Sequence, residues 1–193
     1  MTSAKALAYA RGNRKAHLDS LCDWLRIPSV STLPEHDQDV RWAAEWAANK
    51  LAEVGFEDVV ITETSRHPLV YAERLGLEAA TLLIYGHFDV QPVDPLDEWQ
   101  RPPFEPIVDG ENVYARGASD DKGQTFTILA ALESYLESGA ELPINVKILL
   151  EGEEENVKAA YDLVCSVKGE PPLSTKVENC EICDKKCLYN EKA

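Results

Sequence analysis

Basic residues are scarce in this sequence, and their scarcity excludes several functions. The chain carries 19 lysine and arginine residues against 34 aspartate and glutamate residues, which gives a formal net charge of −15. Nucleic acids and anionic membranes are bound by basic surfaces, so we expect neither of them as a partner. An acidic balance is ordinarily a solvated surface, although it also suits a protein that concentrates divalent cations.

Long apolar runs are missing as well. No segment reaches the roughly 20 apolar residues of a membrane-spanning helix. The first residues, MTSAKALAYARGNRKAHLDSL, lack the apolar core of a secretion signal, and we therefore expect a cytoplasmic location. A length of 193 residues gives room for one good-sized domain with a packed core.

Histidine is sparse, and cysteine gathers near one end. There are four histidines, and none follows His87. Cys180, Cys183 and Cys187 crowd the last stretch. A disulfide framework is not expected without a secretion signal, and a closed zinc site would lack a fourth ligand. We expect residues 156–193 to form a poorly ordered tail, with a small zinc or redox module as the alternative.

The hydrophobic pattern predicts alternating helices and strands. Helical spacing indicates helices over Ala4–Arg26, Asp37–Val54 and Asp120–Leu136, and apolar runs indicate strands over Asp58–Thr62, Leu69–Leu75, Thr81–Tyr85 and Ile144–Leu150. The segment Gln91–Asp109, rich in proline and aspartate, is expected to be a loop. This order predicts an α/β fold with a mostly parallel sheet flanked by helices. Trp42 and Trp46 lie on one side of their helix, and we expect them to pack in the core or against another helix rather than bind a ligand.

Three clusters of titratable residues follow or adjoin these elements. GHFDV follows the strand TLLIY, EGEEE follows the strand INVKILL, and RGASDDKG leads into the last helix. Each cluster alone has an ordinary explanation, such as a helix N-cap or a solvated turn. Ligands of open α/β sheets, however, bind beyond the carboxyl ends of the strands, where these clusters would converge.

Converging carboxylates imply a bound cation. They would raise one another's pKa values, and a metal ion is the common way for such a cluster to stay ionised. One neutral imidazole with carboxylates suits zinc, manganese or cobalt. Two metal ions about 3.5–4 Å apart would need a carboxylate that bridges them, as in several hydrolases.

The motifs GHFDVQPV, WQRPPFEP, ARGASDDKGQ and INVKILLEGEEE resemble those of the M20 metallopeptidase family. More narrowly, they resemble its dipeptidase branch, which includes carnosinase-like and cytosolic non-specific dipeptidases. The resemblance runs from about Leu18 to Glu155, with the motifs in the expected order. It implies metal-dependent hydrolysis of small peptides by a zinc-peptidase-like catalytic domain that binds two divalent ions: zinc, or alternatively manganese or cobalt.

The resemblance also implies a role for individual residues. His87 and Glu155 match metal ligands, and Asp120 matches the carboxylate that bridges the two metals. Glu154 matches the general base, and Asp89 matches the carboxylate that orients the histidine ligand. The peptide bond between Asp120 and Asp121 is expected to be cis. For Glu151 and Glu153, surface or hinge roles are expected.

The resemblance ends after Glu155. Family members are longer chains, with a lid domain that often forms homodimers and a distant histidine ligand, neither of which is recognisable here. We therefore assign residues 1–155 to the N-terminal part of an M20-type catalytic domain and residues 156–193 to an atypical cysteine-containing tail. We expect a truncated chain with weak or no peptidase activity alone. The alternatives are an N-acyl amino acid deacylase or desuccinylase, and a non-catalytic fragment.

Overall fold

A computed structural model describes residues 2–76, 79–140 and 142–156. Contacts divide the chain into two units, Met1–Glu155 and Asn156–Ala193. The fold presented here is that of the first unit. Cys180, Cys183 and Cys187, and the expected order of the tail, lie outside the described residues.

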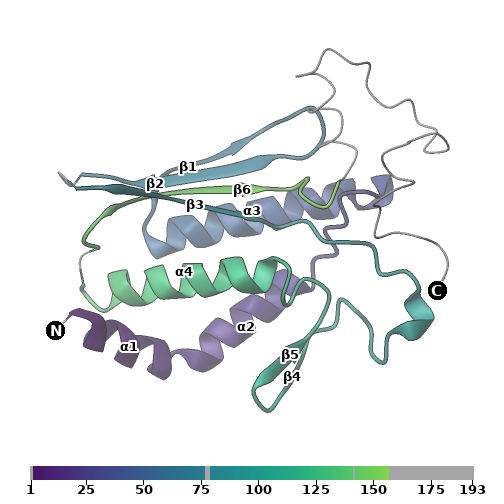
Figure 1. The fold of residues 1–193 in the computed structure, drawn as a ribbon, viewed down its shortest axis with the longest axis horizontal. Helices are drawn as coiled ribbons and strands as arrows, with labels where there is room; N and C mark the ends of the chain where they lie inside the picture. Colours follow the sequence, from purple (N-terminus) through teal and green to yellow (C-terminus); the bar gives the residue numbers. More distant parts are fainter. Residues whose placement is uncertain (1, 77–78, 141, 157–193) are drawn as a thin grey trace, which may run out of the picture. The chain divides into compact units, whose positions relative to one another are not determined.

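A four-stranded sheet forms one layer of the first unit (Figure 1). Its strands, in spatial order, are β1 (Glu57–Thr62), β2 (Leu69–Arg74), β6 (Asn145–Glu151) and β3 (Thr81–His87). β3 and β6 are parallel, whereas β2 is antiparallel to both of its neighbours, β1 and β6. The α/β class is confirmed, but the described part of the sheet is mixed rather than mostly parallel. The physical reason is the β1–β2 hairpin, whose two strands must run in opposite directions.

Helices α3 (Asp37–Val54) and α4 (Lys122–Glu137) pack on the sheet, and α1 (Thr2–Gly12) and α2 (Arg14–Leu25) pack on α4 (Figure 1). The apolar residues whose helical spacing predicts α3 are buried, and they include Val40, Ala43, Ala44, Ala47, Leu51 and Val54. The helix ends at Gly55, whose φ of 95° is left-handed. That conformation is free of steric cost in glycine, so the sequence sets the end of this helix.

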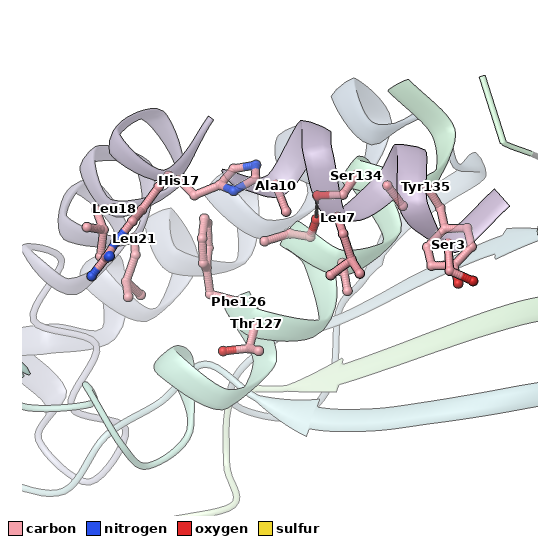
Figure 2. A pocket seen from close by; sticks show the side chains of 14 residues that line it. Ser3, Leu7, Ala10, His17, Leu18, Leu21, Phe126, Thr127, Ser134 and Tyr135 are labelled. Carbon is pink, nitrogen blue, oxygen red and sulfur yellow. Dashed lines mark hydrogen bonds between the residues drawn. The ribbon is translucent and has the colours of Figure 1, made fainter. Parts of the chain in front are cut away.

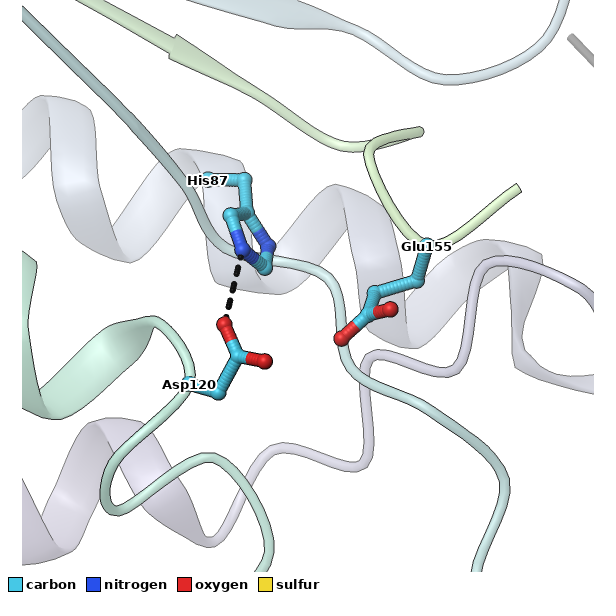
Figure 3. Close-up of side chains that lie close together, drawn as sticks. All are labelled: His87, Asp120 and Glu155. Carbon is cyan, nitrogen blue, oxygen red and sulfur yellow. Dashed lines mark hydrogen bonds and ion pairs between the residues drawn. The ribbon is translucent and has the colours of Figure 1, made fainter. Parts of the chain in front are cut away.

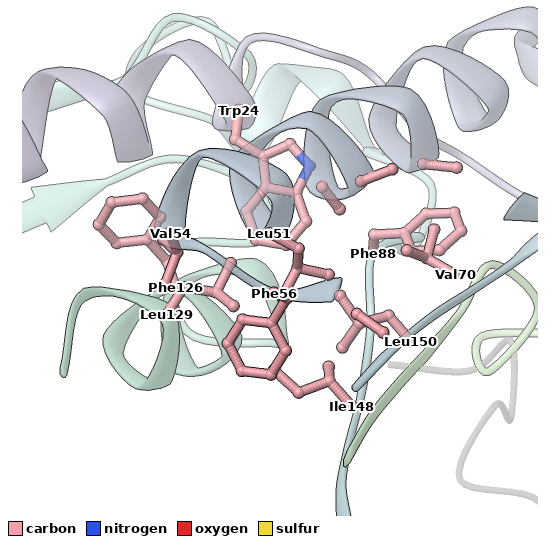
Figure 4. Close-up of a cluster of buried hydrophobic side chains, with 14 of the residues drawn as sticks. Trp24, Leu51, Val54, Phe56, Val70, Phe88, Phe126, Leu129, Ile148 and Leu150 are labelled. Carbon is pink, nitrogen blue, oxygen red and sulfur yellow. The ribbon is translucent and has the colours of Figure 1, made fainter. Parts of the chain in front are cut away.

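The core lies between the sheet and the helices (Figure 4). Alternate residues of β6, Val146, Ile148 and Leu150, are at most 1% exposed, as the two-residue period of a strand requires. Trp24 of α2 stacks on Trp46 of α3 with ring centroids 4.8 Å apart. The predicted packing of Trp46 is therefore confirmed.

Trp42, unlike Trp46, is not packed in the core: 53% of its surface is exposed. Residues at i and i+4 are neighbours on a helix but are offset by about 40° around its axis. Trp42 consequently lies past the edge of the buried stripe, and the prediction that it belongs to the core is wrong.

The single helix predicted over Ala4–Arg26 is interrupted at Asn13, where α1 ends and α2 begins in a different direction (Figure 1). The Asn13 side chain donates a hydrogen bond to the Tyr9 carbonyl. Glycine and asparagine are weak helix formers, so the Gly12–Asn13 pair is a reasonable breaking point. An apolar cavity of about 560 Å³ lies between α1, α2 and α4, lined among others by Leu7, Leu21 and Phe126 (Figure 2).

The predicted loop Gln91–Asp109 contains more structure than expected. Leu96–Glu98 forms the short helix η2, and Ile107–Asp109 forms β4, which pairs with β5 (Asn112–Tyr114). A further short helix, η1, spans Pro34–His36. Elements of three residues are too short to show a hydrophobic period, so the pattern could not reveal them.

Gly86, near the end of β3, allows α4 to approach the sheet closely. A Cβ atom at this position would lie 2.3 Å from Oγ1 of Thr125 and 2.8 Å from Oδ2 of Asp121. Both atoms belong to a hydrogen-bonded pair at the start of α4, 2.7 Å apart. The absence of a side chain therefore lets the helix start sit directly against the strand end.

We predict that Gly86→Ala lowers the free energy of unfolding by about 1–3 kcal/mol, because the added methyl group overpacks this contact. Gly12→Ala is the matched control, since a Cβ at Gly12 meets no atom within 4 Å. In the control, the change should be neutral or stabilising by up to about 1 kcal/mol. Denaturant unfolding of both variants measures the difference, and equal effects would contradict the role of Gly86.

Candidate metal centre

Three segments meet where β3 and β6 end. Because the two strands are parallel and paired in register, His87 lies opposite Glu151. The residues that follow each strand, up to Asp89 and up to Glu155, consequently leave the sheet at the same edge. The start of α4 reaches this edge too, since the Asp121 carboxylate accepts a hydrogen bond from the backbone N–H of His87 at 3.1 Å.

This arrangement brings together His87, Asp120 and Glu155, the three residues that the sequence predicts as metal ligands (Figure 3). Each offers one ligand atom, and the three atoms lie within 4.8 Å of one another. Nε2 of His87 is 3.2 Å from Oδ1 of Asp120. One imidazole nitrogen and two carboxylate oxygens at this spacing match the donor set of a zinc, manganese or cobalt ion, so these residues fit such a metal.

Asp89 orients the imidazole of His87 through contacts with Nδ1. Its Nδ1 lies 3.3 Å from a carboxylate oxygen of Asp89 and 3.2 Å from the Asp89 carbonyl oxygen, so this nitrogen faces acceptors. Nε2 is consequently left to face Asp120. An acceptor at one ring nitrogen fixes the tautomer that leaves the other nitrogen free to ligate a metal.

Asp89 is fully buried, and its carboxylate connects the segments of the centre. Oδ2 accepts hydrogen bonds from the Ser31 hydroxyl at 2.6 Å and from the backbone N–H of Glu155 at 3.0 Å. Oδ1 accepts one from the backbone N–H of Glu154 at 3.3 Å. The same side chain thus holds both the histidine and the turn that carries the two glutamates.

The glutamate run after β6 divides into different environments. Glu154 has a half-exposed side chain with Oε2 3.7 Å from Nε2 of His87, at the margin of the centre. Glu155 takes part in the ligand group, and its carboxylate accepts a hydrogen bond from Gln91. Glu153 points to Arg66 at 3.7 Å, and Glu151 accepts a hydrogen bond from Tyr85. Adjacent glutamates therefore have separate surroundings, as residues leaving a strand in alternate directions should.

The peptide bond between Asp120 and Asp121 is cis, which confirms the expectation from the family resemblance. The two side chains then separate. Asp120 faces His87, and Asp121 accepts hydrogen bonds from His87 and from the Thr125 hydroxyl. Asp121 therefore anchors the start of α4 to the end of β3.

Negative charge dominates the electrostatics of the centre. Burial alone would lower the pKa of His87, but the hydrogen bond and charge of Asp89, with the charges of Glu154 and Asp121, raise it to about 9. Burial raises the pKa of Glu155, the hydrogen bond from Gln91 lowers it, and the charge of Asp120 raises it further. The shift at His87 therefore reflects the nearby carboxylates, which favour a positive charge at this place, whereas the shift at Glu155 comes first from burial.

Sequence reasoning missed Ser31, Gln91, Asp121 and Thr125. Gln91 and Asp121 belong to the motifs that the sequence analysis quotes, so their closeness to the predicted ligands was a usable signal. Ser31 lies in the loop IPSVSTLPEHD, far along the chain from every cluster. Its contact with Asp89 depends on the tertiary fold, and no local pattern indicates it.

Comparisons with known proteins agree with this geometry. The model of peptidase family M20/M25/M40 matches residues 83–183, which include His87, Asp120 and Glu155. The chain belongs to this family. The match extends to residue 183 and thus past Glu155, where the last recognisable motif of the family ends in the sequence.

The proteins similar to this chain include dipeptidases and a desuccinylase. Cys-Gly metallodipeptidase DUG1 of Candida albicans is 33% identical over 153 residues, which cover 72% of this chain and 32% of the relative. Succinyl-diaminopimelate desuccinylase of Shewanella pealeana is 32% identical over 135 residues, covering 69% and 33%. The crystal structure of human carnosine dipeptidase 1 superposes with a TM-score of 0.72 at 27% identity, covering 86% and 37%. The chain thus spans about a third of the length of each of these proteins.

Within the part of the chain that the structure describes, the helices fall short of what a bilayer crossing needs in length and apolar character.

We predict that Asp89→Asn weakens zinc binding by about 10- to 100-fold, although Asp89 is not in the ligand group. The amide has a single acceptor oxygen, so it cannot receive the bonds from Ser31, Glu154 and Glu155 while also facing His87. The control is Asp39→Asn, because Asp39 pairs with His36 at the start of α3. Titration of both variants against a chelating dye measures affinity, and equal affinities would refute the supporting role.

Proposed function

We propose that residues 1–155 form the N-terminal part of an M20-type catalytic domain and contribute its metal centre to the hydrolysis of small peptides. The observation that carries the proposal is the convergence of His87, Asp120 and Glu155, with Glu154 at its margin. His87 and Glu155 would serve as metal ligands. Asp120, of which 73% of the side chain is exposed, would offer its second oxygen to a second ion and so bridge two metals.

Divalent ions held in such a centre polarise the scissile carbonyl and make a water molecule more acidic. The residues of this chain would supply the proton transfers and the positioning. Glu154 would accept a proton from a water molecule at the centre. This role is supported by a side chain that is 45% exposed and by an oxygen that lies 3.7 Å from Nε2 of His87. The same carboxyl group could then deliver the proton to the leaving amine. Asp89 would keep the imidazole of His87 turned toward the centre.

Zinc is the proposed metal, with manganese or cobalt as alternatives, because the donors are one imidazole and several carboxylates. A dipeptide is the proposed substrate class, supported by similarity to a Cys-Gly metallodipeptidase and to carnosine dipeptidase 1. Acyl amino acids are the second candidate, since succinyl-diaminopimelate desuccinylase is similar to this chain at 32% identity. Hydrolysis rates on Cys-Gly and on a succinyl amino acid would separate the two classes. Homodimerisation stays a prediction from the family resemblance.

We predict that the chain binds zinc and that His87→Ala reduces the bound metal to background, because the single imidazole donor of the centre is removed. His36→Ala is the matched control. His36 pairs with Asp39 at 2.6 Å, away from the ligand group, and its loss should leave metal content unchanged. Metal analysis of dialysed protein gives the stoichiometry for each variant. If the protein binds none of zinc, manganese or cobalt, the proposed metal centre is refuted and a non-catalytic role is favoured.

We predict that Glu154→Gln retains metal and lowers the dipeptide hydrolysis of the unsubstituted chain, itself expected to be weak, by about 100-fold or more, since a general base contributes roughly this factor. Glu151→Gln is the control, because Glu151 lies in the same glutamate run and contacts Tyr85 instead of the centre. Turnover is assayed with added zinc, manganese or cobalt. Hydrolysis that survives in Glu154→Gln would remove this residue from the mechanism without affecting the ligand assignment.

A further inference from the structure

The loop between α2 and α3 runs alongside the residues that follow β3, and two buried serines connect them. Ser29 and Ser31 are both fully inaccessible to solvent. The Ser29 hydroxyl donates to the backbone carbonyl of Phe88 at 2.6 Å, and the backbone N–H of Val90 donates to the Ser29 carbonyl at 2.9 Å. The Ser31 hydroxyl instead donates to the carboxylate of Asp89, also at 2.6 Å. Two equally buried hydroxyls of one loop thus hold the backbone and the carboxylate of adjacent residues.

Among the described partners of the Asp89 carboxylate, Ser31 belongs to the α2–α3 loop and not to the segments that end β3 and β6. The other partners are the backbone N–H groups of Glu154 and Glu155 and the imidazole of His87. A rotation of the carboxylate would disturb all of these contacts together. The Ser31 hydroxyl contacts Oδ2 of this carboxylate from the same loop whose Ser29 contacts the backbone of Phe88 and Val90.

Ser31 is itself held in place by two cationic or titratable side chains. Its carbonyl oxygen accepts hydrogen bonds from Nε2 of His67 at 2.9 Å and from Nη2 of Arg66 at 3.2 Å. Arg66 lies 3.7 Å from Glu153, in the turn that also carries Glu154 and Glu155. The segment between β1 and β2 therefore supports both the serine and the glutamate turn.

We propose that Ser31 is a positioning residue of the metal centre, whose hydroxyl orients the Asp89 carboxylate and thereby the donor atoms of His87 and Glu155. The proposal rests on the proposed metal centre and adds a residue from a loop that contributes no ligand. Hydrogen bonds to a charged acceptor are stronger than neutral ones, so this contact is well suited to hold the carboxylate. Loss of such outer contacts typically weakens metal affinity by about 10- to 100-fold.

The competing explanation is that Ser31 stabilises the fold in the same way as Ser29. A comparison of the two serines can distinguish these explanations. Both are 0% exposed, and both hydroxyls donate hydrogen bonds of 2.6 Å, so they differ mainly in the acceptor. Removal of either hydroxyl should lower thermal stability to a similar extent. Only the Ser31 contact leads to the donor atoms of the centre.

The test compares Ser31→Ala with Ser29→Ala, each at matched fraction folded. We expect Ser31→Ala to bind zinc about tenfold more weakly and to shift the visible absorption bands of bound cobalt(II), which report ligand geometry. Ser29→Ala should keep both properties of the unsubstituted chain.

A second pair, Ser31→Thr and Ser31→Val, controls for folding and added volume, because the two side chains have the same shape and differ in the hydroxyl. Threonine should restore the affinity, and valine should not. Zinc affinity and cobalt spectra that are unchanged in Ser31→Ala, or changed equally in Ser29→Ala, would overturn the positioning role.

His87→Ala distinguishes failure of this proposal from failure of the metal centre. Zinc binding that is lost in His87→Ala but intact in Ser31→Ala refutes the serine alone. Absence of zinc binding in the unsubstituted chain refutes the centre and the serine's role together.

Discussion

The parallel pairing of β3 with β6 is the constraint on which the candidate site depends. Its register sets His87 opposite Glu151, so the residues that follow each strand emerge at one edge of the sheet. A slip of one residue would turn every side chain of a strand to the opposite face and would remove Val146, Ile148 and Leu150 from the core. The hydrophobic burial that stabilises the sheet therefore also fixes the position of the proposed metal ligands. Chemistry and stability are coupled here through the same strand pair.

Asp89 converts this backbone arrangement into a site. An ionised carboxylate without access to water costs several kcal/mol unless hydrogen bonds and charges compensate it. Here the compensation comes from the Ser31 hydroxyl, two backbone N–H groups and an imidazole. These donors belong to the α2–α3 loop, the glutamate turn and the end of β3. Each segment thus contributes a contact to the Asp89 carboxylate, and the carboxylate in turn holds the segment in place. This shared partner explains why three distant parts of the sequence keep a fixed geometry.

Much of this could be predicted from the sequence, because strands, helices and acidic clusters are local patterns. The runs TLLIY and INVKILL predict β3 and β6, and the acidic clusters after them predict where a site would lie. The individual roles of His87 and Glu155 come from the family resemblance rather than from the local pattern. Predictions failed at the break at Asn13 and at the exposure of Trp42, where the Gly12–Asn13 pair and the offset of about 40° between i and i+4 were local signals that the hydrophobic pattern did not weigh. They failed also at the antiparallel pairing of β2 with β6, which only the tertiary fold decides. The role of Ser31 could not be predicted either, because its contact with Asp89 is formed only in the tertiary fold. A serine in a loop carries no signal until the fold brings a carboxylate to it.

The charge pattern of the centre explains why a metal ion, and not simply protonation, suits it. The raised pKa of His87 means that the surrounding carboxylates favour a positive charge there, and the burial that raises the pKa of Glu155 makes its ionised form costly without a counter-charge. A proton can neutralise one donor at a time, and a protonated imidazole no longer offers a lone pair. A divalent ion in the proposed centre would be held by His87, Asp120 and Glu155 together, since their ligand atoms lie within 4.8 Å of one another. Such an ion would relieve the mutual repulsion of the carboxylates and would require a neutral histidine. At a net charge of −15, the rest of the chain adds a long-range attraction for such a cation, and this attraction weakens as salt increases.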